Sequence, residues 1–125
     1  MTRQELQQRT KKFNIDVIIF CNFLPKTVAG FELGKQLIRS ASSVGANYRA
    51  SSRAKSTADF INKIQIVIEE ADECAYWFEV ILESHINRDA ELIRLKREAY
   101  ELTAIFTATN KTIKSRFKRR ENITT

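Results

Sequence analysis

The chain is predicted to fold as an all-α, up-down-up-down antiparallel four-helix bundle, and three observations lead to this prediction. Three Gly and one Pro in 125 residues leave few turns, so long helices are favoured over a sheet-rich fold. Apolar residues recur at alternating spacings of four and three, the period of a helix packed nearly parallel to its neighbours. Short connections between these segments make successive helices antiparallel. A chain of this length is expected to form one domain, residues 1–125.

The first two helices are expected at about residues 3–24 and 28–54. Pro25 ends the first helix because its ring disfavours helix in the preceding residue, and Thr27 is placed to cap the second. Gly45 is expected to allow a close backbone approach rather than to break its helix. The inward-facing lines are Leu6, Thr10, Phe13, Val17, Phe20 and Leu24 in the first helix, and Leu37, Ala41, Val44 and Tyr48 in the second.

The third and fourth helices are expected at about residues 57–84 and 89–118. Ser56 and Asp59 have the spacing of a capping box at the start of the third helix, and the residues from about Arg119 onward are expected to fray. The inward-facing lines are Phe60, Ile64, Val67, Ala71, Cys74, Phe78 and Ile81 in the third helix, and Leu92, Leu95, Ala99, Leu102, Phe106, Thr109, Ile113 and Phe117 in the fourth.

The first helix carries a second apolar line on the side opposite its core line. A helix that is apolar on all sides is normally buried on all sides, and a four-helix bundle cannot cover both faces of one helix. An oligomer interface is therefore expected. Its candidate residues are Ile15, Ile18 and Ile19 of the first helix, with Ile66 and Trp77, which fall opposite the core line of the third.

Charge is distributed unevenly along the chain. Residues 56–84 hold seven acidic residues and one lysine, a net charge of −6. The whole chain has a net charge of +6, so the other residues together carry +12. This asymmetry indicates a basic surface for a polyanion or acid-to-base contacts between elements or subunits, with scattered solvated charges as the third explanation. The acids of the third helix are expected to pair with Arg39, Arg49 or Arg53 of the second.

Basic residues gather near both ends of the chain. The start of the first helix and the end of the fourth lie at the same end of such a bundle, so the two groups are expected to combine into one surface that binds phosphates in a salt-dependent way. Favourable helix-dipole contacts and solubility are the alternative explanation. The candidate nucleic-acid-binding residues are Arg3, Arg9, Lys11, Lys12, Lys111, Lys114, Arg116, Lys118, Arg119 and Arg120.

A short polar line of Ser43, Asn47 and Ser51 lies within the second helix. It allows two interpretations, a recognition face or a buried asparagine that fixes the register of the helices. The second is favoured, because a single polar residue in a helical seam can specify register.

No enzyme activity, metal or cofactor is predicted. The single histidine, His85, cannot supply a Ser-His-Asp set or the paired Glu-x-x-His motifs of a di-iron bundle, and the glycines lack the context of a phosphate loop. Cys21 and Cys74 are expected to be small buried hydrophobes in a reducing compartment. With no signal-peptide pattern and only short apolar runs, a cytoplasmic protein without a membrane partner is expected.

Several segments make the chain closely resemble the four-helix-bundle family named after the protein encoded in intervening sequences of bacterial large-subunit ribosomal RNA. They are GKQLIRS at 34–40, SVGANYRA at 43–50, RAKS at 53–56, DFI at 59–61 with Lys63, EEADEC at 69–74 with Tyr76 and Trp77, and ELTAIF at 101–106. The resemblance covers most of the chain.

This resemblance implies a ring-shaped homopentamer. It also implies a relation to accessory proteins of reverse transcriptases in diversity-generating retroelements, whose basic surfaces contact nucleic acid and the enzyme. We therefore expect a non-enzymatic homo-oligomeric bundle that acts as a nucleic-acid-associated accessory protein, with RNA or DNA, a reverse transcriptase and further copies of itself as partners. The alternative is a protein-interaction scaffold whose charge asymmetry serves self-assembly or docking of another protein.

Overall fold

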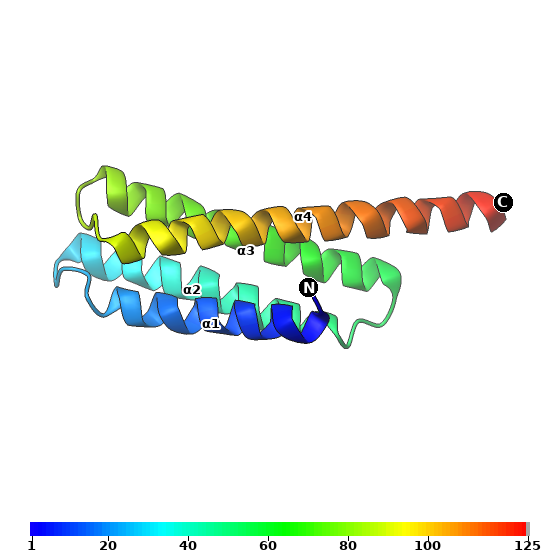
Figure 1. Ribbon diagram of the computed structural model, residues 1–125, viewed down its shortest axis with the longest axis horizontal. Coiled ribbons are helices and arrows are strands. Elements are labelled where there is room, and N and C mark those ends of the chain that lie inside the picture. The colour runs from blue at the N-terminus through cyan, green and yellow to red at the C-terminus, as the bar shows by residue number, and fades with distance from the viewer. Residues whose placement is uncertain (125) are drawn as a thin grey trace.

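The computed structural model describes residues 1–124, with the side chains of residues 1–122. It contains four helices, α1 (Arg3–Cys21), α2 (Val28–Ser51), α3 (Thr57–Glu83) and α4 (Ala90–Thr124), and no strand within these residues. Successive helices run in opposite directions beside one another (Figure 1). The predicted all-α, up-down-up-down bundle is therefore confirmed.

The capping residues predicted for α2 and α3 are in place. Thr27 precedes α2, and its hydroxyl accepts a hydrogen bond from the amide of Gly30 at 3.1 Å. Ser56 accepts in the same way from the amide of Asp59 at 3.0 Å. The Asp59 carboxylate accepts from the amide of Lys55 at 2.9 Å, so only half of the predicted capping box forms.

α1 and α2 each end before the predicted residue, at Cys21 and Ser51. After each of these ends, the backbone forms one narrower turn instead of an extended segment. The amide of Leu24 donates to the carbonyl of Cys21, and that of Ala54 donates to the carbonyl of Ser51, each three residues back. Such bonds satisfy the last carbonyls of a helix through a narrower turn. The predicted ranges had included these two turns.

The predicted inward lines form one continuous core. Phe20 meets Phe78 edge-on with ring centroids 5.9 Å apart, and Tyr48 packs on Phe106 at 4.9 Å. The buried core residues are Phe13, Val17, Phe20, Leu24, Leu37, Ala41, Val44, Tyr48, Ile64, Val67, Ala71, Cys74, Ala75, Phe78, Ile81, Leu92, Leu95, Ala99, Leu102 and Phe106. The heptad assignment is therefore confirmed through the centre of the bundle.

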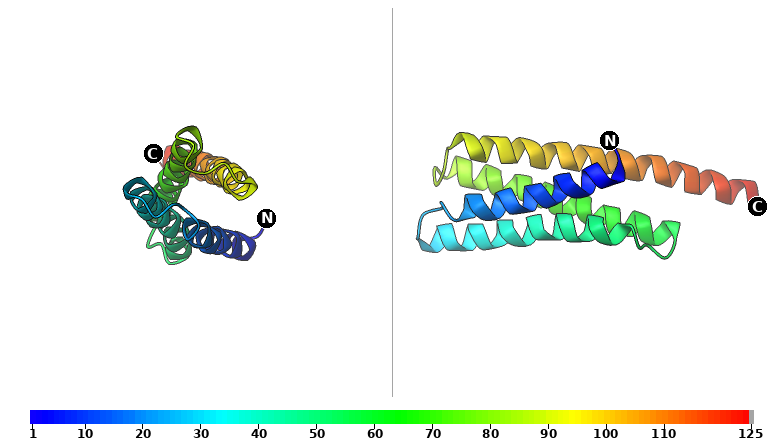
Figure 2. Two further views of the ribbon diagram at one scale, coloured as in Figure 1. Left: turned by 90° about the vertical axis from the view of Figure 1, so that its left-hand side faces the viewer. Right: turned by 60° about the horizontal axis from the view of Figure 1, so that its bottom comes forward.

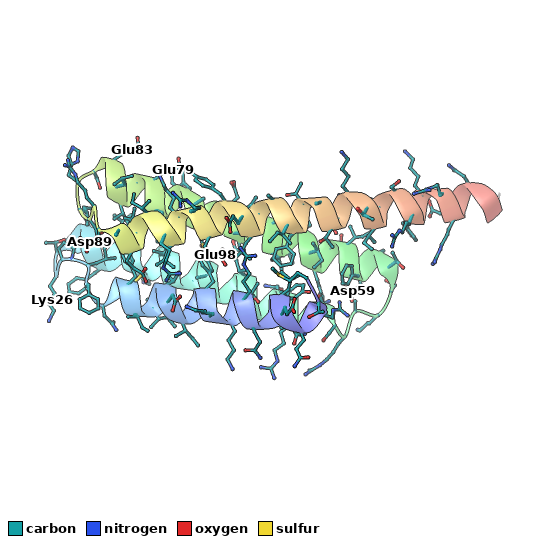
Figure 3. The ribbon with its side chains drawn as sticks, in the orientation of Figure 1. Lys26, Asp59, Glu79, Glu83, Asp89 and Glu98 are labelled. Atoms are coloured by element: carbon teal, nitrogen blue, oxygen red, sulfur yellow. The ribbon has the colours of Figure 1, made fainter. Side chains whose placement is uncertain are left out.

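α1 and α4 lie on the remaining side of the bundle, farther apart than the other neighbouring helices (Figure 2). Ion pairs connect the two helices. Arg9 of α1 donates to both carboxylate oxygens of Glu98 at 2.7 and 2.6 Å, and to Glu101 at 2.6 Å. Further along, Arg94 of α4 donates to Asp16 at 2.9 Å. Figure 3 shows Glu98 in the space between the two helices. This bidentate geometry fixes the position of α1 against the first half of α4.

Both cysteines are unpaired thiols among apolar side chains. Cys74 is fully buried in the core, and Cys21 is half-buried with its Sγ–H directed to the carbonyl of Gly34 at 3.7 Å. Burial raises the pKa of Cys21 to about 12 and also raises that of Cys74.

Candidate nucleic-acid interface and self-association surface

The second half of α4 extends beyond the other helices. The sequence predicted an end near residue 118 and fraying from Arg119, but the helix continues to Thr124. The chain has no Gly or Pro after Gly45, so no strong helix breaker stops α4. Its last turns pass the start of α1 and the α2–α3 connection (Figures 1 and 2). We call residues 111–124 the basic arm.

The cations of the basic arm point into solvent. Six cations and one acid occupy this segment. All six, Lys111, Lys114, Arg116, Lys118, Arg119 and Arg120, are exposed. The first five take part in no ion pair among residues 1–122. The arm therefore presents a high local density of positive charge without a structural partner for most of it.

Most of the N-terminal candidates do not join the arm. Arg9 is held by the two carboxylates of α4 described above, and Lys12 pairs at 2.7 Å with a carboxylate one turn further along α1. Arg3 comes closest, because its guanidinium lies 5.5 Å from the ring centroid of Phe60, and both residues line a shallow pocket with Ile113 of the arm. Of Arg3, Arg9 and Lys12, only Arg3 therefore lies near the arm, so the two basic groups do not combine into one surface as predicted.

Lys11 lies beside an open polar groove of ≈ 610 Å³ between α1 and α2, opposite Arg49. Within the groove, the hydroxyl of Ser42 donates to the side-chain carbonyl of Asn14 at 3.1 Å. A Cβ at Gly45 would stand 3.6 Å from the nearest backbone atom of α1, an ordinary contact. Gly45 therefore lies where the backbone of α1 approaches an unbroken α2, as expected, although alanine would also fit there.

The buried asparagine of the bundle is Asn110, not Asn47. Asn47 is half-buried and donates to the carbonyl and hydroxyl of Ser43 in its own helix, both at 2.9 Å. Asn110 is 3% exposed and donates to the carbonyl of Ile61 in α3 at 3.1 Å, while its Oδ1 is buried without a partner. Asn110 is also the last buried residue of α4 among those with described side chains, so it connects α4 to α3 where the arm begins.

The predicted outer stripe of α1 lies on the surface. Ile15, Ile18 and Ile19 are 47%, 40% and 51% exposed, and Ile66 of α3 is exposed as well. Trp77 differs from the prediction, because it is half-buried against the core and its Nε1 donates to Glu73 at 3.3 Å. The apolar surface available to a second copy is therefore centred on α1.

Sequence reasoning missed three apolar side chains that enlarge this surface. Phe23, Val28 and Phe31 are 75%, 88% and 66% exposed around the α1–α2 connection, which Lys26 marks in Figure 3. Such a concentration of exposed aromatic and branched side chains is unusual on a monomer. The presence of three apolar residues so close to the loop could have indicated this surface in the sequence. They were missed because they follow no helical period.

The acidic residues of α3 are partly neutralised within the chain. Arg39 of α2 donates to Glu73 at 2.6 Å and to Glu70 at 3.4 Å, as one of the predicted acid–base pairings. Burial and the neighbouring Glu73 raise the pKa of Glu70. Burial would also raise the pKa of Glu73, but hydrogen bonds from Glu70, Trp77 and Arg39 outweigh it and lower that pKa.

Other acids remain on the outside of the bundle. Glu79 and Glu83 lie on the side away from α1 (Figure 3). Glu79 accepts from the hydroxyl of Tyr100 at 2.6 Å, which raises the pKa of Tyr100 to about 12. Within residues 1–124, no three His, Cys, Asp or Glu side chains are grouped as metal ligands. No helix in this range is both long and apolar enough to cross a bilayer.

Comparisons with other proteins match most of the chain. A family model described as 23S rRNA-intervening sequence protein matches residues 2–108. No curated protein sequence matches the chain. Among solved structures, the chain is similar to a protein of unknown function from the S23 ribosomal protein family of Bacteroides thetaiotaomicron. The identity is 28%, the TM-score is 0.81, and the alignment covers 89% of this chain and 99% of that one.

Proposed function

The chain belongs to the 23S rRNA-intervening sequence protein family, and from this premise we propose that it is a non-enzymatic, homo-oligomeric accessory protein that binds RNA or DNA. The basic arm is the element that makes the contact. Its side chains reach phosphates in a sequence-independent way, with Arg3 and Lys11 as secondary contacts.

The observation that supports this proposal most is the contrast between the cations of the arm and those of the bundle. Arg9, Lys12 and Arg94 are paired with carboxylates, so their charge stabilises the fold. The arm concentrates six cations on a helix that buries no side chain after Asn110 among those described. Charge that does not serve the core is available to a polyanion.

The apolar surface of α1 supports self-association. Ile15, Ile18 and Ile19, with Phe23 and Phe31, are exposed apolar side chains that a second copy would cover. A homopentamer is the assembly that the resemblance implies. Five arms would multiply the contacts to one nucleic acid, and a reverse transcriptase is the enzyme partner that follows from the same resemblance.

Fluorescence anisotropy with labelled RNA and DNA of unrelated sequences tests the binding proposal. Changing Lys114, Arg116, Lys118 and Arg119 together to Gln should weaken binding to all sequences alike. It should also flatten the dependence of log affinity on log salt, which is about −0.9 per neutralised phosphate on duplex DNA and about −0.7 on single strands. Absence of binding by the unmodified protein at low salt would favour the scaffold alternative.

Light scattering coupled to size-exclusion chromatography tests self-association separately. The double variant Ile15→Asp, Ile19→Asp places charge where the interface is proposed and should lower the molar mass. The matched pair Thr107→Asp, Ala108→Asp adds the same two negative charges at exposed positions of α4, away from the stripe, and should leave the mass unchanged. A monomeric unmodified protein, or a double isoleucine variant of unaltered mass, contradicts this part of the proposal.

A further inference from the structure

Resting on the proposed function, we propose that the basic arm binds duplex DNA as a helix lying in the major groove. Lysines on one side of the arm contact one phosphate backbone, and arginines on another side contact the opposite backbone. Duplex DNA is thus the one class of nucleic acid that we expect the arm to prefer.

The cations of the arm lie on two sides of the helix. At 3.6 residues per turn, Lys111, Lys114 and Lys118 fall within about 60° of the helix circumference. Arg116 lies about 170° and Arg119 about 110° around the helix from the centre of that row. Figure 3 shows side chains tipped with nitrogen leaving this end of α4 in opposite directions. A flat phosphate surface can meet one row only, whereas a groove with charged walls can meet both.

The arm matches the major groove of B-form DNA in width. An α-helix with its side chains is about 10–12 Å across, and the major groove of B-form DNA, about 12 Å wide, admits such a helix. The major groove of A-form RNA is deep and narrow, and is not read by side chains in this way. The dimensions of the arm therefore favour DNA over double-stranded RNA.

The arm offers few surfaces on which bases can stack. Proteins that hold single strands combine a basic groove with aromatic side chains that stack on successive bases. Phe117 is the one aromatic residue of the arm, and it is half-buried. The arm thus offers charge without a stacking platform, as backbone contacts to a duplex require.

The arm continues a helix whose position is fixed by the core. The arm is the direct continuation of the part of α4 that packs in the core, so its direction is set before any DNA binds. Its fourteen residues, 111–124, extend about 21 Å, or about six base pairs at 3.4 Å each. The family match ends at residue 108, so this contact belongs to a segment outside the matched region.

The decisive experiment breaks the arm helix without changing its charge. Ser115 is exposed near the middle of the arm, and Ser115→Pro removes a helical hydrogen bond and kinks the helix. Affinity for a labelled 20-base-pair duplex DNA should fall at least about tenfold, because the two rows no longer reach both walls of the groove. Ser115→Ala is the matched control and should bind as the unmodified protein does. Circular dichroism and thermal melting would show that the bundle remains folded in both variants.

The same anisotropy assay should separate the classes of nucleic acid. At equal salt, the duplex DNA should bind at least about tenfold more tightly than single-stranded DNA or an RNA duplex of the same length and sequence. The lysine row (Lys111→Gln, Lys114→Gln, Lys118→Gln) and the arginine row (Arg116→Gln, Arg119→Gln) should each lower the affinity and the salt slope. Lys26→Gln with Lys35→Gln, two exposed lysines outside the arm, is the control for loss of charge and should change neither.

Three outcomes are distinguishable. A preference for duplex DNA that is lost in Ser115→Pro supports the groove. Equal binding of duplex and single strands, equal binding of RNA duplex, or unaltered binding by Ser115→Pro overturns the groove but leaves nucleic-acid binding intact. Failure to bind any of the three probes at low salt overturns the proposed function together with this inference.

Discussion

The two halves of α4 share one backbone conformation and have opposite surroundings. Between Ala90 and Asn110, the helix buries a residue on every turn, against α3 and toward α1. Between Lys111 and Asn122, it buries none. Charge follows the same division, because Arg94, Glu98 and Glu101 of the first half pair with α1, whereas five cations of the arm pair with no carboxylate in residues 1–122.

The difference shows that the spacing of apolar residues predicts which face of a helix is apolar, but not whether other helices cover that face. Ile113 and Phe117 continue the apolar spacing of α4, yet both are only half-buried. α1 begins at Arg3 and α3 at Thr57, so little of the bundle lies alongside the arm (Figure 1). The first half of α4 is stabilised by the protein itself, and the second half is free to make contacts outside it.

Removing one ring from each half gives the largest expected contrast. Phe106→Ala should lower the free energy of unfolding by about 3–5 kcal/mol, because it leaves a cavity beside Tyr48. Phe117→Ala should cost no more than about 1 kcal/mol, since this ring is outside the core. Urea denaturation followed by circular dichroism measures both. Similar losses in the two variants would mean that the arm is packed in solution.

The ionic contact between α1 and the first half of α4 should be the next most sensitive. Arg9→Ala leaves Glu98 without its bidentate partner, and we expect a loss of about 1–2 kcal/mol in the free energy of unfolding. Lys114→Ala, in the arm, should stay within about 0.5 kcal/mol of the unmodified protein. Denaturation at high salt should shrink the Arg9 effect, and an effect of Lys114→Ala as large as that of Arg9→Ala would contradict the division.

Acid should weaken the contact between Asp16 of α1 and the first half of α4. Burial would raise the pKa of Asp16, but hydrogen bonds from Lys12 and Arg94 outweigh it and lower that pKa. A carboxylate with a lowered pKa stabilises the fold above its unfolded-state value, 3.8, and this stability is lost as the pH falls further. The loss should be up to about 1 kcal/mol after solvent screening. It should be absent from Asp16→Asn when unfolding is measured between pH 7 and pH 3.

Deleting the arm should have the smallest effect on stability. Among the deleted residues with described side chains, 113–122, none is buried in the core, so the free energy of unfolding of a chain ending at Thr112 should stay within about 1 kcal/mol of the full chain. Its helix content by circular dichroism should fall in proportion to the residues removed. A markedly destabilised truncated bundle would show that the arm packs against the protein or a second copy.

The interior of the fold was predictable because its period is long and unbroken. The lines through Phe13, Val17, Ile64 and Leu95 are buried as the heptad spacing requires. At the far end of α4, the spacing pointed to Thr109, but Asn110 is the buried residue. A straight helix drifts by about 20° per heptad from a 3.5-residue repeat, so the inward position moves by one residue after several turns.

The sequence was enough to predict which residues form the candidate site, but not how they are arranged in space. The sequence named the cations of the arm, yet it could not show that Arg9 reaches across to Glu98, because that contact joins residues 89 positions apart. It also missed Phe23 and Phe31, since side chains near a turn follow no helical period. Pairing and exposure both depend on which helices lie alongside, and that information is tertiary.

The burial of the two native thiols makes this chain convenient for site-specific labelling. With a pKa of about 12, Cys21 is almost wholly protonated at neutral pH, and Cys74 is enclosed by the core, so neither should react quickly with a maleimide. A cysteine introduced at the exposed Ser115 would then carry a fluorophore or spin label without removal of the native residues. Distances between labelled arms would report how copies are arranged around one another and whether the arms converge on a ligand.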